Sequence, residues 1–190
     1  MTNSLNSDTY SCQQCNASIP QELYSANFCP KCCALSPSYK ALLVDFFKRA
    51  FVLKELDEAV RQYLKGEYVS AARTATIILE NEVKKESCDD GKFGVDLMSN
   101  ALLFTYDSNA NTVTKMPKIK LNDLSTNTKR NEQEGMKFLC MGLMAGCRNV
   151  FAHSHGHAAP EDCLSVVLLC NFALKQMKHK SIAEQLHKDA

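Results

Sequence analysis

The sequence has no tryptophan, only 7 glycines and 5 prolines, and no apolar run near the roughly 18 to 20 residues that a membrane-spanning helix needs. Few glycines and prolines favour a mostly helical chain with few tight turns. The first twenty residues lack the basic start and apolar stretch of a secretion signal, so we expect a cytoplasmic protein with no membrane partner. The formal net charge of only +1 excludes a generic basic coat for duplex nucleic acid, but it leaves room for a local basic groove.

The composition is that of an ordinary globular protein. With 190 residues, 45% of them hydrophobic and 23% charged, the chain can form one compact domain of about 150 residues plus a small appendage. Disorder throughout is excluded because the apolar fraction is too high. We expect the appendage over residues 1–36 and an all-α domain of four to six helices over 37–190.

Ten cysteines stand out, and five of them lie between Cys12 and Cys33. Cys12 and Cys15 form one CxxC pair, and Cys29 and Cys32 form a second after thirteen intervening residues. Each CxxC turn presents two thiolates, and two such turns supply the four soft ligands of a tetrahedral zinc site. The pattern predicts a structural zinc ribbon with Zn²⁺ as its cofactor, closed to catalysis. Cys33 is the alternative to Cys32, and four free or redox-active thiols are the alternative to a metal site.

The remaining residues carry a helical period. Apolar residues recur at helical spacing, which predicts helices over about 38–63, 67–85, 97–104, 132–148 and 161–177. The last two contain cysteines seven apart, Cys140 with Cys147 and Cys163 with Cys170, which favours core packing over chemistry. We expect Phe138 near a packed face, and no strand outside the ribbon.

The least helical stretch is residues 106–131. It is polar, and its basic residues are Lys115, Lys118, Lys120, Lys129 and Arg130. It is either a solvated loop or a basic arm near a nucleic-acid site.

The densest chemical cluster runs from Arg148 to His157. Arginine matches phosphate oxygens, and histidine exchanges protons near neutral pH. Together they suit metal-free RNA cleavage, in which His153 assists attack by the ribose 2′-hydroxyl and Arg148 stabilises the crowded phosphorus, while Asn149 orients the histidine or holds the turn. Arg148 and His153 stand about 140° apart on a straight helix, so they meet only if the helix ends first or two chains contribute.

Two other interpretations of this cluster remain open. Arg148 could form a salt bridge while the histidines cap a helix end. Alternatively, the alternating His153, His155 and His157 could bind a metal, although no carboxylate follows until Glu161.

At these residues the chain resembles the HEPN domains, whose mark is R-x4-6-H, present here as Arg148-Asn149-x-x-x-His153. The stretch from about Leu56 to Met177 is similar to the Ymh-type branch, often associated with abortive infection; Val150 replaces a proline usual in that branch. The resemblance implies a HEPN-like helical bundle that dimerises with its motifs facing each other. It also implies, frequently, a metal-independent endoribonuclease acting in antiviral defence or as a toxin.

Three hypotheses follow. The first is a homodimeric endoribonuclease that binds RNA, with a protein inhibitor or activator as a further candidate partner. The second is a non-catalytic HEPN module that binds RNA or regulates a partner. The third is a metal-dependent hydrolase that uses the histidines at 153, 155 and 157.

Overall fold

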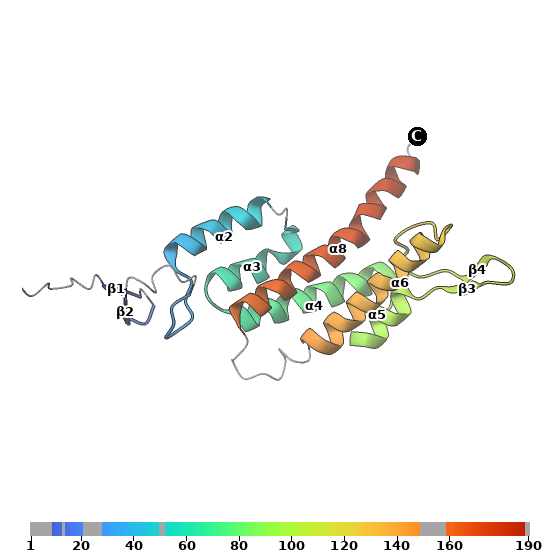
Figure 1. The fold of residues 1–190 in the computed structure, drawn as a ribbon. Coiled ribbons are helices and arrows are strands. Elements are labelled where there is room, and N and C mark those ends of the chain that lie inside the picture. Colours follow the sequence, from blue (N-terminus) through green and yellow to red (C-terminus); the bar gives the residue numbers. More distant parts are fainter. Residues whose placement is uncertain (1–8, 13, 21–27, 50–51, 149–158, 189–190) are drawn as a thin grey trace, which may run out of the picture.

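The computed structural model describes residues 9–12, 14–20, 28–49, 52–148 and 159–188, with their side chains except at 9, 10, 20 and 179–188. Within these ranges the chain is mostly helical, as the sequence predicts, and two small hairpins accompany the helices (Figure 1). In chain order the elements are β1 (Thr9–Ser11), β2 (Ser18–Pro20), α2 (Pro37–Arg49), the 3-10 turn η1 (Lys54–Leu56), α3 (Asp57–Leu64), α4 (Tyr68–Ser87), α5 (Gly94–Leu102), β3 (Thr105–Asp107), β4 (Thr112–Lys115), α6 (Asn127–Gly142), the π-helical η2 (Leu143–Arg148) and α8 (Pro160–Lys188).

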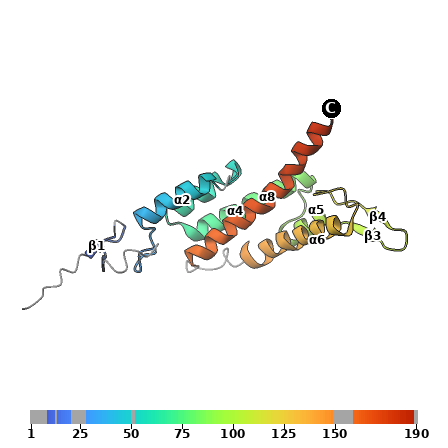
Figure 2. The same ribbon diagram turned by 45° about the horizontal axis from the view of Figure 1, so that its top comes forward.

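Helices α4 and α8 form the centre of the bundle and lie side by side (Figures 1 and 2). They run in the same direction. Near the start of α8, the hydroxyl of Tyr63, which lies at the end of α3 just before α4, donates to the Pro160 carbonyl at 3.1 Å. Farther along both, Lys178 lies 3.7 Å from Glu82. The helices approach closely because three α4 positions are small and fully buried: Ala71, Ala72 and Ala75.

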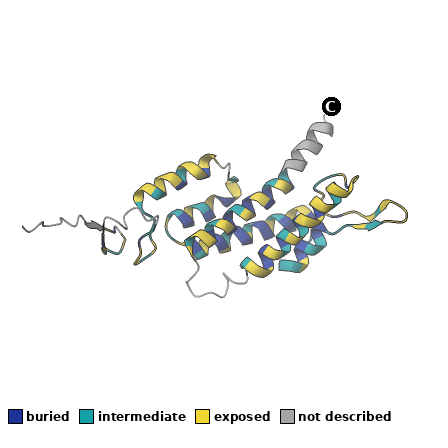
Figure 3. Ribbon diagram, viewed as in Figure 1, coloured by how far each residue is buried: buried dark blue, intermediate teal, exposed yellow. Residues whose placement is uncertain are grey.

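The core lies where α4, α5, α6 and α8 face one another, whereas α2 lies at the outside and buries only Leu43 and Phe47 (Figure 3). Cys140, Cys163 and Cys170 are buried, which confirms their prediction as core residues, and Cys147 is half-buried. Burial raises the pKa of the Cys140 thiol to about 12, so this sulfur stays protonated and unreactive. Across the described residues, no helix is long and apolar enough to cross a membrane.

The expectation of a bundle without strands is wrong, because β3 and β4 pair as an antiparallel hairpin. Its turn is built by Asp107, whose carboxylate accepts from the backbone N–H of Asn109 at 2.8 Å and of Ala110 at 3.2 Å. Asn111 completes the turn at φ 52°, a left-handed conformation that asparagine tolerates. The strands are only three and four residues long, so they carry too little alternation to be found by period.

Two helix boundaries also differ from the prediction. The expected helix over 38–63 is divided into α2 and α3; the break includes η1, and the Asn171 side chain accepts from the Leu53 backbone N–H at 3.0 Å. Helix α6 begins at residue 127 rather than 132, because the Thr126 hydroxyl caps it by accepting from the Lys129 N–H at 3.3 Å. The first turn of α6 is polar, so no apolar residues recur there at helical spacing, and the sequence pattern did not reveal it. Phe138, expected near a packed face, is 58% exposed.

Three of the five basic residues between 106 and 131 are engaged within the protein. Lys118 pairs with Asp89 at 2.7 Å, and Lys129 pairs with Asp123 at 2.8 Å. The Arg130 guanidinium stacks 3.9 Å above the ring of Tyr106. These partners favour a structural role for the segment over a basic arm.

Candidate functional site

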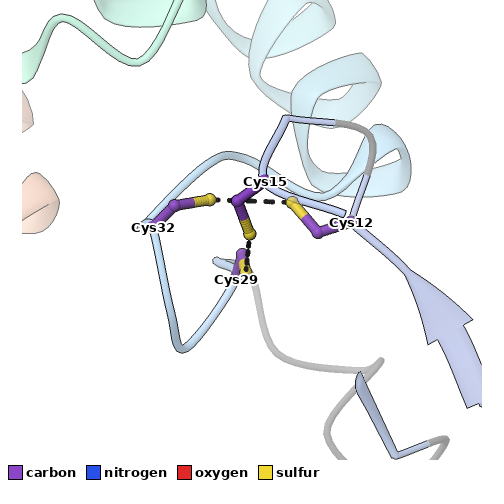
Figure 4. Close-up of side chains that lie close together, drawn as sticks. All are labelled: Cys12, Cys15, Cys29 and Cys32. Carbon is purple, nitrogen blue, oxygen red and sulfur yellow. Dashed lines mark hydrogen bonds between the residues drawn. The ribbon is translucent and has the colours of Figure 1, made fainter. Parts of the chain in front are cut away.

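The four predicted cysteine ligands come together at the amino end of the chain. The sulfur atoms of Cys12, Cys15, Cys29 and Cys32 all lie within 4.8 Å of one another (Figure 4). Sγ of Cys12 lies 3.6 Å from Sγ of Cys32, and the sulfurs of Cys15 and Cys29 are 3.8 Å apart. A tetrahedron with Zn–S bonds of about 2.3 Å has edges of about 3.8 Å. The cluster could therefore hold a metal ion.

The two CxxC turns are built alike. The Asn16 N–H donates to the Cys12 carbonyl and the Cys33 N–H donates to the Cys29 carbonyl, both at 2.8 Å. Asn16 and Cys33 both adopt left-handed backbone conformations, with φ of 54° and 57°. Cys33 is therefore the counterpart of Asn16, a residue that closes a turn, and its exposed side chain lies outside the four-sulfur group. The structure thus favours Cys32 over Cys33 as the fourth ligand.

Backbone N–H groups in this cluster favour the thiolate form of Cys12. Hydrogen bonds from the N–H groups of Cys15 and Gln14 lower the pKa of the Cys12 thiol to about 6. Burial acts in the opposite direction on Cys32 and raises its pKa to about 12. A bound dication would stabilise all four as thiolates, because it offsets the crowding of negative charge.

The cysteine cluster is joined to the helical bundle by aromatic side chains. The Tyr68 hydroxyl donates to the Cys33 carbonyl at 2.6 Å. The ring of Phe28, next to Cys29, meets Tyr39 and Tyr68 edge-on, with centroids 5.4 Å and 5.9 Å away. The second CxxC turn is therefore packed on the starts of α2 and α4.

Arg148, the first predicted catalytic residue, lies at the end of the π-helical segment η2. Single π-helical turns are uncommon and occur frequently at functional sites. The Arg148 side chain is 32% exposed, and its Nη2 lies 3.1 Å from Oε2 of Glu80. Because a guanidinium has five N–H donors, this ion pair leaves others for a ligand.

Glu80 is the residue that positions Arg148. Its side chain projects from the middle of α4 and is only 5% exposed. Its Oε1 accepts a 2.6 Å hydrogen bond from the Gly94 N–H at the start of α5. One carboxylate thus satisfies a free N–H at a helix start and holds a cation from η2.

Gly94 allows this contact. It has φ +54°, and a Cβ there would lie 3.6 Å from Nη1 of Arg148, so its backbone lies close to the guanidinium. Sequence reasoning missed both residues. Glu80 lies beside the buried residues Thr76, Leu79 and Val83 of α4, and a charge at that position is the signal that could have revealed it.

The other residues of the predicted cluster are not placed by the structure. Asn149 and His153, predicted to act with Arg148, lie outside the described residues. So do His155 and His157, the remaining members of the alternative metal site. Of the predicted catalytic group, the described residues therefore contain Arg148 alone, and they add Glu80 as its partner.

The fold and the site define a class of protein: a helical bundle with a four-cysteine cluster at its amino end and, at a π-helical turn, a partly exposed arginine paired with a buried carboxylate. Residues 54–177, about two thirds of the chain, match a family model described as "Protein of unknown function (Hypoth_ymh)", and the protein belongs to this family. The match confirms the Ymh part of the resemblance drawn from the sequence. It includes Arg148 and Glu80 but excludes the cysteine cluster. No curated protein and no solved structure matches the chain.

Proposed function

We propose that this protein is a metal-independent endoribonuclease of the HEPN type, acting on RNA as a homodimer in the cytoplasm, in antiviral defence or as a toxin. One observation carries the proposal. The guanidinium of Arg148 is oriented by the buried Glu80 yet remains one third exposed. It stands five residues before His153, in the spacing that the HEPN resemblance requires.

The chemistry needs a base, an acid and a phosphate ligand. An imidazole of His153 takes the proton of a ribose 2′-hydroxyl, whose oxygen attacks the neighbouring phosphorus. The bond from phosphorus to the 5′-oxygen breaks, and that oxygen receives a proton from the His153 imidazole of a second copy of the chain. Arg148 stabilises the charge on the non-bridging oxygens. The products carry a 2′,3′-cyclic phosphate and a 5′-hydroxyl.

The test is incubation of the wild-type chain with mixed cellular RNA in EDTA, followed by analysis of the fragment ends. We expect cleavage with cyclic-phosphate ends by the wild type and by a His155→Ala control, and none by His153→Ala. Equal cleavage by the wild type and His153→Ala would refute the assigned role of His153.

We also infer that the four cysteines hold a structural Zn²⁺. The Cys12–Cys32 and Cys15–Cys29 sulfur distances match the edge of a Zn–S₄ tetrahedron, and the N–H groups around Cys12 favour its thiolate. A four-thiolate site has no open position, so the ion would stabilise the amino-terminal segment without taking part in cleavage. Elemental analysis should find one zinc ion per wild-type chain and no zinc in the Cys29→Ser chain.

The ion pair itself favours a second candidate, a non-catalytic HEPN module that binds RNA or a protein. Glu80 offsets the charge of Arg148, as expected where an arginine only joins helices. This function predicts RNA or protein binding without cleavage, and binding that depends on Arg148 but not on His153.

A further inference from the structure

Phe93 is a large apolar side chain that the fold holds at the surface. It is 60% exposed, at the residue just before α5. Nζ of Lys84 lies 3.6 Å from the centroid of its ring. An ammonium over the ring face is a cation–π contact, which orients the ring without burying it.

The same residue lines an open pocket of about 530 Å³ beside α5. Asp96, Ser99 and Asn100 face the pocket from one side of α5, and Lys92 adds a cation from the preceding loop. The pocket thus combines an aromatic ring, a cation, one carboxylate and the side chains of Ser99 and Asn100, of which Asn100 already donates to Asp89 at 2.7 Å; together they offer donors and acceptors to the edge of a planar ligand.

Arg148 lies close to the same loop. Gly94 follows Phe93 directly, and a Cβ on Gly94 would meet Nη1 of Arg148 at 3.6 Å. Phe93 is thus the sequence neighbour of a residue that lies beside the arginine proposed to bind phosphate, although Arg148 does not itself line the pocket.

We propose that Phe93 is a stacking platform for an unpaired base of the RNA; this inference rests on the proposed RNA function. Every base has a π face, so a phenylalanine platform tolerates many sequences. The bases of a duplex are already stacked on one another, so they cannot stack on the ring. Lys92 contacts the backbone phosphate, and the polar side chains on α5 bond the base edge.

The chain supplies a matched control in Phe138. This residue is also exposed, at 58%, and also has a lysine over its ring, with Nζ of Lys137 at 4.6 Å from the centroid. It does not line the pocket beside α5. Loss of Phe138 removes a similar exposed ring from another surface.

The experiment measures the fluorescence anisotropy of a labelled single-stranded RNA, titrated in EDTA with chains that carry His153→Ala so that the RNA stays intact. We expect Phe93→Ala and Phe93→Leu to weaken binding about ten-fold or more, since one stacked base contributes that much. Phe93→Tyr and Phe138→Ala should bind as before. Circular dichroism checks that every variant is folded. An RNA duplex of the same length should bind weakly and without dependence on Phe93.

Each outcome decides between the proposals. If the wild type cleaves RNA but the Phe93→Ala chain binds RNA as tightly as the Phe138→Ala chain, Phe93 is not a stacking platform. The nuclease proposal is then still supported. Binding retained by Phe93→Leu would also overturn the stacking platform, because apolar bulk without a ring would then suffice. If RNA binding depends on Phe93 but the wild type cleaves no RNA, the stacking platform is supported and the proposal of nuclease activity is refuted. No RNA binding by any of these chains, together with no cleavage by the wild type, would overturn both.

Discussion

Replacing Arg148 by alanine should damage the fold as well as any activity. In the wild type the Glu80 side chain is only 5% exposed, and the substitution removes the cation that pairs with it. Removing one partner of a buried ion pair costs about 3–5 kcal/mol. Here the Gly94 N–H still bonds the carboxylate and Arg148 is partly solvated, so we expect a lower cost, about 2–3 kcal/mol.

This cost can be separated from the loss of a functional arginine. In the double variant Glu80→Gln/Arg148→Ala, the amide oxygen can still accept from Gly94 and no charge is buried. The double variant should therefore be more stable than Arg148→Ala by at least about 1 kcal/mol, although it lacks the same guanidinium. Both variants should lack nuclease activity.

The assay is thermal and urea unfolding followed by circular dichroism. For a chain of this size about 1 kcal/mol shifts the melting temperature by about 2–4 °C, so Arg148→Ala should melt about 4–12 °C below the wild type. Arg61→Ala is the control, because Arg61 pairs with Glu58 at 2.6 Å on the surface and its loss should cost at most about 1 kcal/mol. A double variant no more stable than Arg148→Ala would refute a buried unpaired charge as the cause.

Three further predictions concern the rest of the molecule. Removal of metal by a chelator should expose four more thiols to a thiol reagent while the bundle stays helical, because the buried cysteines of the cluster pack separately from the main core. Gln133→Ala should destabilise the bundle by about 2–4 kcal/mol in urea titrations. The reason is that this buried side chain bonds the Leu102 and Ile119 carbonyls and the Leu121 N–H, which the substitution leaves unpaired. Lys178→Met should cost about 0.5–1 kcal/mol near neutral pH, and this cost should shrink as the pH falls from the ordinary glutamate pKa, about 4.3, through the lowered pKa of Glu55. The hydrogen bond from Lys178 lowers the pKa of Glu55, so its stabilisation is present above the unfolded pKa and is lost as the carboxylate is protonated; unfolding measured across pH tests this.

Features of the fold that depend on short, local sequence patterns could be predicted from the sequence. The four cysteines are separated by fixed intervals, and the turn that each CxxC forms depends on its own backbone. The apolar period of α4 and α8 likewise extends over many turns and is not sensitive to one residue. The β3–β4 hairpin and the start of α6 were missed because they depend on hydrogen bonds that backbone N–H groups donate to Asp107 and Thr126. A polar side chain that caps a turn adds nothing to the apolar period.

The partner of Arg148 could not be predicted, because the pair joins positions 68 residues apart in sequence. In the sequence, Glu80 cannot be told from an exposed helix glutamate. In the fold, its contacts with α5 and η2 exclude water from its carboxylate. Once buried, it must be paired, and the only arginine bonded to it among the described residues is the one in the HEPN-like motif. The same contact therefore serves the fold and orients the proposed phosphate ligand. A loss of activity in Arg148→Ala identifies the phosphate ligand only if the Glu80→Gln/Arg148→Ala chain, with its stability restored, is also inactive.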